Sequence, residues 1–149
     1  MKAASFFSRD QQDSILAAVR EAENCTSGEI RVHIETYCEE DVLDRAAWIF
    51  KKLGMHKTAL RNGVLFYLAV HDHKFAILGD AGINAVVPEG FWNDIKAKML
   101  LHFREGRFSE GLCEGIIMAG NQLKEHFPCK SDDKNELSDE ISFDNVKEK

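Results

Sequence analysis

Three oxygen-bearing side chains and one arginine are the residues of this sequence that could share a chemical task. They are Glu29, Asn62, Asp80 and Arg61. Carboxylate and amide oxygens are hard ligands of the kind that Ca²⁺ and Mg²⁺ prefer. An arginine beside them could hold a phosphate oxygen through its guanidinium group. The alternative is that Arg61 forms a salt bridge with Glu29 or Asp80 and only closes the end of a sheet, and both interpretations stay open here.

The elements around these residues are predicted from the periodicity of apolar side chains. Residues 29–36 alternate apolar and polar positions, which predicts a half-buried strand and places His33 on its solvent face. Residues 63–70 are apolar on both faces and predict a central strand, and a short turn joins it to a strand over 74–79 in an antiparallel hairpin. A helical pattern over 42–53 separates the first two strands, which predicts a right-handed crossover between parallel strands.

The direction of these strands decides which polar residues meet. A parallel crossover followed by a reversal gathers the four residues named above at one end of the sheet. Asp72 lies at the other end, on the order of 20 Å from Asp80 at ~3.3 Å per residue, so the two cannot ligate one ion. His71 and His73 flank Asp72 and could face a metal together, but a solvated hairpin turn is the simpler interpretation. We therefore expect any cation site at the Glu29 end.

Further helical patterns surround the strands. Ser8 followed by Gln11 is a capping-box pattern that begins a helix, and apolar stripes over 92–103 and 112–123 predict two more helices. With one more short strand in the loop after Asp80, these elements predict an α/β domain. Its mixed sheet of about four strands would contain a parallel crossover and an antiparallel hairpin, with helices on both faces.

Composition limits the classes of function. The chain has 149 residues and a net charge of −6, which argues against a nucleic-acid binder. The four cysteines lack metal-ligand spacing and predict free thiols in a reducing compartment. No apolar run is long enough for a signal peptide or a membrane span, which favours a cytoplasmic protein. We expect a monomer, and the sequence does not identify a protein partner.

The chain divides into a domain and a tail. Residues 1–128 carry the predicted strands and helices, and Pro128 ends the last helix. Residues 129–149 are rich in Asp, Glu, Ser, Asn and Lys and poor in apolar side chains. Such a segment cannot bury enough surface to offset the entropy of ordering it, so we predict a disordered acidic tail.

Five segments in order resemble the TPM-domain family, whose domain is shared with a thylakoid-lumen acid phosphatase and a photosystem II repair protein. The segments are Thr26-Ser27-Gly28-Glu29-Ile30-Arg31-Val32, Arg61-Asn62-Gly63-Val64-Leu65-Phe66-Tyr67-Leu68-Ala69, Lys74-Phe75-Ala76-Ile77-Leu78-Gly79-Asp80-Ala81-Gly82-Ile83, Phe108-Ser109-Glu110-Gly111-Leu112 and His126-Phe127-Pro128. The resemblance spans roughly residues 8–128. It implies a compact αβα sandwich.

The resemblance also implies that Glu29, Asn62 and Asp80 lie at the polar crevice of the family, to which divalent cation binding and acid phosphatase activity have been ascribed in some members. Our first hypothesis is a module that binds Ca²⁺ or Mg²⁺ without catalysis, because no nucleophile and base stand side by side. The alternatives are a metal-assisted phosphatase, with Arg61 holding the phosphate, and a structural protein-interaction domain in which the cluster is only ion pairing. Whether the protein is an enzyme stays open.

Overall fold

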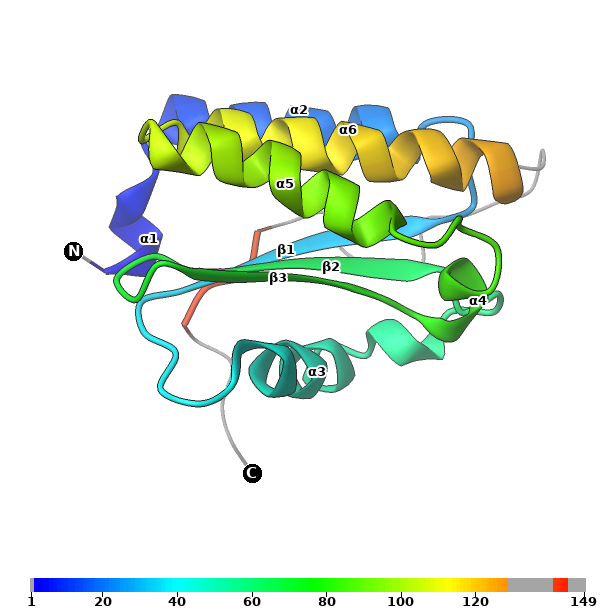
Figure 1. The fold of residues 1–149 in the computed structure, drawn as a ribbon, viewed down its shortest axis with the longest axis horizontal. Helices are drawn as coiled ribbons and strands as arrows, with labels where there is room; N and C mark the ends of the chain where they lie inside the picture. The colour runs from blue at the N-terminus through cyan, green and yellow to red at the C-terminus, as the bar shows by residue number, and fades with distance from the viewer. Residues whose placement is uncertain (1, 129–140, 145–149) are drawn as a thin grey trace.

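Helices cover both faces of a single sheet (Figure 1). The computed structural model describes residues 2–128 and 141–144. The helices of one face are α2 (Arg9–Glu23), α5 (Phe91–Arg104) and α6 (Phe108–His126). The opposite face carries α3 (Val42–Lys52) and the 3₁₀ helix η1 (Met55–Lys57), and α1 (Ala3–Phe6) precedes α2. The predicted αβα sandwich is confirmed. None of the helices in the described part of the chain is long and apolar enough to cross a membrane.

The sheet has the predicted chain directions. Its strands are β1 (Glu29–Glu35), β2 (Gly63–Ala69) and β3 (Lys74–Gly79), in the order β1-β2-β3. β1 and β2 run parallel around the α3 crossover, and β2 and β3 form the antiparallel hairpin. β2 is therefore central, and all of its residues are buried.

The prediction of about four strands is wrong in detail, because the described residues form a three-stranded sheet. The loop after β3, where a further short strand was expected, forms the helix α4 (Ala81–Asn84) instead. The Asp80 side chain accepts a hydrogen bond from the Ala81 backbone N–H at 2.8 Å. An aspartate at this position favours a helix start, because it satisfies a donor that would otherwise have no partner.

Two hydrophobic cores lie on the two sides of β2. Val64, Phe66 and Leu68 belong to the core beneath α2, α5 and α6. The intervening residues Leu65, Tyr67 and Ala69 belong to the core on the α3 side. This separation follows from the alternation of side chains along a strand, and it explains why β2 lacks a polar face.

The predicted capping box begins α2, where Ser8 Oγ accepts from the Gln11 backbone N–H at 3.1 Å and Gln11 Oε1 accepts from the Ser8 backbone N–H at 2.9 Å.

The C-terminal end of α6 is hydrogen-bonded to the residues just before β1. Thr26 Oγ1 lies 2.9 Å from the Leu123 carbonyl oxygen, and Ser27 N–H donates to the Phe127 carbonyl at 2.9 Å. A Cβ added to Gly28 would lie 2.6 Å from the Leu123 side chain, so α6 and the chain before β1 are in close contact.

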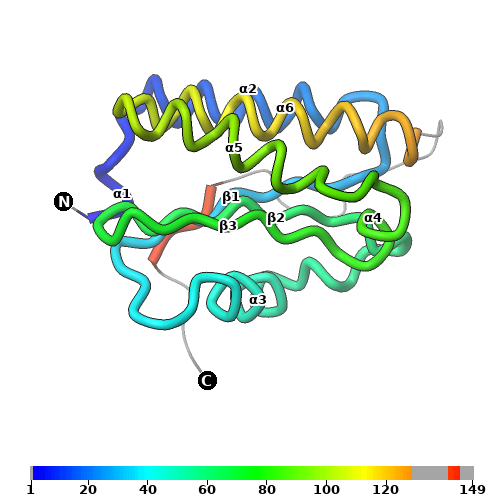
Figure 2. Tube along the Cα trace, viewed as in Figure 1, coloured from blue at the N-terminus to red at the C-terminus, as the bar shows by residue number. Residues whose placement is uncertain are grey.

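The placement of His33 on a solvent face is wrong, because its exposed fraction is 0%. The polar side of β1 faces the α3 layer, where the His33 ring stacks on Tyr67 with centroids 6.1 Å apart. Residues 141–144 lie beside the same strand, with Ser142 bridged to His33 in parallel pairing (Figure 2). For these four tail residues the structure differs from the expectation of disorder. The rest of the predicted disordered tail lies outside the described residues.

Candidate functional site

Glu29, Asn62 and Asp80 lie at one end of the sheet, as the chain direction requires. Glu29 is paired with Gly63 in the β1–β2 register, and Asn62 directly precedes that glycine. The Asp80 backbone N–H donates to the Gly63 carbonyl at 2.9 Å. All three predicted side chains are buried, with exposed fractions of 2% for Glu29, 1% for Asn62 and 8% for Asp80.

Arg61 and Asp80 form a bidentate ion pair. The Arg61 Nε donates to Asp80 Oδ2 at 2.7 Å, and Arg61 Nη2 donates to Asp80 Oδ1 at 2.9 Å. The hydrogen bond and the charge of Asp80 raise the pKa of Arg61. The Arg61 side chain is nevertheless 52% exposed, so solvent reaches this pair. Of the alternatives left open by the sequence, the structure therefore shows a salt bridge between Arg61 and Asp80 at the end of the sheet.

The loop that carries Arg61 is fixed by close packing against α4. Arg61 has a positive φ of 52°, and its carbonyl accepts from the Gly82 N–H at 2.8 Å. A Cβ added to Gly82 would lie 2.1 Å from the Leu60 carbonyl oxygen. Only glycine allows this approach, and the approach sets the position of the Arg61 side chain over Asp80.

Asn62 carries a buried hydrogen-bond acceptor, its side-chain oxygen Oδ1. Its Nδ2 lies 3.4 Å from Ser27 Oγ, a long hydrogen bond. Its Oδ1 has no hydrogen-bond partner among the described residues. Since a buried acceptor without a donor costs about 1–3 kcal/mol, a ligand that supplies positive charge here would gain affinity by removing that cost.

The donor set at this end is two carboxylates and one amide. Among residues 2–128 and 141–144 there is no cluster of three or more His, Cys, Asp or Glu side chains with the geometry of a metal site. The proposed role of Asn62 as the third oxygen donor stays a prediction, as does the role of Arg61 toward phosphate. Two of the five N–H donors of Arg61 are directed at Asp80.

A second polar cluster, which the sequence did not reveal, lies toward the other end of β1. Glu35 accepts hydrogen bonds from Arg45 Nε at 2.9 Å, Arg45 Nη2 at 2.7 Å and Tyr67 Oη at 2.6 Å. His33 Nε2 lies 3.3 Å from Glu35 Oε2. Burial raises the pKa of Glu35, but the bonds from Arg45, His33 and Tyr67 outweigh it and lower that pKa to about 2. The signal for this cluster was a tyrosine in the apolar strand β2, opposite His33 in the parallel register.

The turn at 71–73 has a structural role. Asp72 Oδ2 accepts from the Cys38 backbone N–H at 2.7 Å, and this bond lowers the pKa of Asp72. Asp72 therefore connects the loop after β1 to the hairpin.

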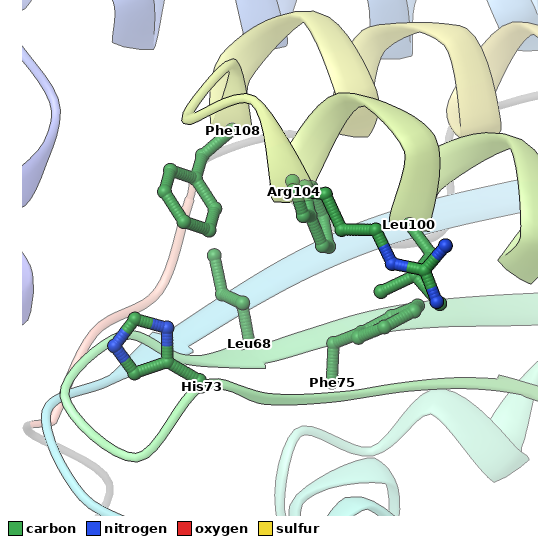
Figure 3. A pocket seen from close by; sticks show the side chains of 7 residues that line it. Leu68, His73, Phe75, Leu100, Arg104 and Phe108 are labelled. Atoms are coloured by element: carbon green, nitrogen blue, oxygen red, sulfur yellow. The ribbon is translucent and has the colours of Figure 1, made fainter.

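An apolar cavity of about 190 Å³ opens beside His73, between the hairpin and the junction of α5 with α6 (Figure 3). It is lined by Leu68, His73, Phe75, Leu100, Phe103, Arg104 and Phe108.

One family model and several solved structures match this chain. The family model of the TPM domain matches residues 1–122. The BA42 protein from the psychrophilic bacterium Bizionia argentinensis has a solved structure with a TM-score of 0.87 and 47% identity, covering 93% of this chain and 96% of that one.

More distant solved structures share the fold. The N-terminal domain of a Porphyromonas gingivalis protein has a TM-score of 0.71 at 22% identity, covering 85% of this chain and 84% of that one. The N-terminal domain of a Corynebacterium glutamicum protein has a TM-score of 0.64 at 12% identity, covering 79% of this chain and 74% of that one. Among curated proteins, none matches.

Proposed function

This chain belongs to the TPM-domain family, and on that premise we propose that it is a small module that binds a divalent cation, Ca²⁺ or Mg²⁺, without catalysis. The ligands are Glu29, Asn62 and Asp80 at one end of the sheet. The observation that carries the proposal is Asn62 Oδ1, a buried oxygen without a hydrogen-bond partner among the described residues. Two carboxylates beside an amide oxygen form a hard donor set, which suits these two cations.

Arg61 competes with the cation in this proposal. The guanidinium and a metal ion would share the carboxylate of Asp80, so binding requires Arg61 to turn away from it. The half-exposed side chain of Arg61 has room in solvent to do so. Cation affinity is therefore weakened by the cost of breaking the ion pair, and removal of the arginine side chain strengthens it.

Titration with CaCl₂ and with MgCl₂, at ionic strength held constant with NaCl, tests the proposal. The signals to follow in ¹H–¹⁵N NMR spectra are the Asn62 side-chain amide and the Arg61 Nε–H. We expect saturable shifts of both, tighter binding by Arg61→Ala, and loss of binding in Asn62→Leu. Arg107→Ala is the matched control, because Arg107 pairs with Glu105 on an exposed surface at 3.0 Å.

A lack of shifts at Asn62 below millimolar metal would refute the cation site. In that case the Arg61–Asp80 pair is only a closure of the sheet end, and the TPM fold serves another purpose. Unchanged affinity in Arg61→Ala would refute the competition alone and would leave the cation site in place.

A further inference from the structure

β1 is an outer strand of the sheet, and part of its free edge is covered by the C-terminal segment Ile141–Asp144 (Figures 1 and 2). Ser142 N–H donates to the Val32 carbonyl at 3.0 Å, and Ile34 N–H donates to the Ser142 carbonyl at 2.9 Å. These are the bonds of a parallel strand pair. A strand edge with unpaired backbone groups is a template for such pairing with any extended segment.

The side chains of β1 add selectivity to the backbone bonds. His33 Nδ1 lies 2.6 Å from Ser142 Oγ, and the Thr36 backbone N–H donates to Asp144 Oδ1 at 2.7 Å. The Thr36 hydroxyl also hydrogen-bonds Asp144. The intervening residues Ile141 and Phe143 are half-buried and pack against the core beneath α2, α5 and α6. The edge thus accommodates an apolar residue, a hydroxyl residue, an apolar residue and an acid in succession.

Charge near the acidic position favours the same pattern. A cavity of about 610 Å³ adjoins Asp144, and its walls include the Arg45–Glu35 ion pair and the basic residue Lys2, which leaves a net positive charge beside the acid. The other end of the edge is closed, because Ile30 N–H donates to Glu23 Oε2 at 2.7 Å. Strand addition is therefore confined to the stretch from Val32 to Thr36.

We propose that this edge, from Val32 to Thr36, is a peptide-binding site. Its ligand is an extended segment of a partner protein with the pattern apolar, Ser or Thr, apolar, Asp, which adds to the sheet parallel to β1. Residues 141–144 of the chain itself occupy the site as an internal ligand of the same chemistry. The contacts to the backbone of β1, to His33 and to Thr36 depend only on the four-residue segment and not on the rest of its chain. A segment of another chain with the same pattern therefore makes them equally well.

The internal ligand is exchangeable because only short-range, non-covalent contacts of four residues hold it. It makes two backbone hydrogen bonds to β1 and further bonds to His33 and Thr36, and each contributes little net free energy because water replaces it when the segment leaves. Its advantage over a free peptide is its tether, because a segment of the same chain binds intramolecularly and needs no second molecule. A variant with a weakened internal ligand should therefore bind an added peptide more tightly than the unchanged chain does.

The test uses the full chain and a fluorescent peptide with the sequence of residues 138–149. Ser142→Pro removes the N–H that bonds Val32, and Asp144→Ala removes the acceptor for Thr36. We expect the double variant to bind the peptide at least about tenfold more tightly than the unchanged chain, with the single variant Asp144→Ala in between. NMR shifts on binding should centre on the amides of Ile34 and Thr36.

Two controls separate strand addition from unspecific attachment. The same peptide with proline in place of its fifth residue, the serine that corresponds to Ser142, should not bind. Asp13→Ala, which removes an exposed acid from α2, should behave as the unchanged chain. The proposal is overturned if the peptide binds to neither tail variant although the NMR spectra show that both variants are folded. Binding with shifts confined to other elements, or equal affinity for all variants, overturns it as well.

Discussion

Replacement of Arg45 by methionine should destabilise the protein in a way that depends on pH. Methionine keeps most of the apolar stem but removes the guanidinium that donates two hydrogen bonds to Glu35. The Glu35 side chain is 4% exposed and that of Arg45 is 15% exposed, so solvent replaces little of the lost interaction. The change leaves a buried carboxylate with Tyr67 and His33 as its remaining partners.

The magnitude follows from the pKa of Glu35. A fall from 4.5 to about 2 corresponds to roughly 3 kcal/mol of stabilisation of the ionised form, at about 1.4 kcal/mol for each tenfold change. Breaking a buried ion pair by removing one partner costs about 3–5 kcal/mol, and the remaining bonds to Glu35 reduce that figure here. We expect Arg45→Met to lose about 2–3 kcal/mol of unfolding free energy at pH 7.

The pH dependence separates charge from packing. The folded-state pKa of Glu35 lies below its unfolded value, so its contribution is complete above about pH 4.5 and is lost as the pH falls toward 2. Without Arg45, burial raises the Glu35 pKa, and the variant has less to lose on acidification. The difference in stability between the two proteins should therefore shrink between pH 7 and pH 2.5.

Urea unfolding followed by far-ultraviolet circular dichroism at both pH values measures this difference. Arg107→Met is the matched control, because it breaks an exposed pair with Glu105 and should leave stability unchanged within error. An equal loss at pH 7 and at pH 2.5 would show that Arg45 acts through packing, for example against the Trp48 ring, 4.5 Å from its guanidinium carbon. That result would refute the electrostatic account of the cluster.

Three further substitutions test the fold around the two sites by urea unfolding. Gly82→Ala should cost about 1–3 kcal/mol or more, since its Cβ would meet the Leu60 carbonyl at 2.1 Å, whereas an unchanged unfolding midpoint would contradict the packing argument. Ser8→Ala should cost about 1 kcal/mol by removing the capping box, and Ser8→Thr should retain most of it. Thr26→Val should lose about 1 kcal/mol with the hydroxyl bond to α6, and an unchanged unfolding midpoint would exclude that bond as a stabilising contact.

The gathering of Glu29, Asn62 and Asp80 was predictable because it depends on chain direction alone. A helix between two neighbouring strands favours a parallel pair, and a short turn requires a reversal, so three positions in the sequence indicate one end of the sheet. The pairing of Arg61 with Asp80 was one of two open alternatives. Periodicity places residues on a face but does not say which charges on that face touch.

The burial of His33 and Glu35 was not predictable in the same way. Alternation of apolar and polar residues separates the two faces of β1, but it does not reveal what covers each face. Here the polar face lies under the α3 layer and is compensated by Arg45 and Tyr67, which come from distant parts of the chain. Residues 141–144 escaped prediction because composition averages over the whole tail, whereas two apolar residues at alternate positions suffice for pairing.

The hydrogen bonds between the end of α6 and the residues before β1 set a minimum length for any recombinant fragment of this domain. The family match ends at residue 122, one position before Leu123. Leu123 is fully buried over Gly28, and Phe127 receives the hydrogen bond from Ser27. A protein ended at the limit of the match would expose the start of β1 to solvent beside the proposed cation ligands. Expression boundaries should therefore include Pro128, which forms an antiparallel bridge with Thr26.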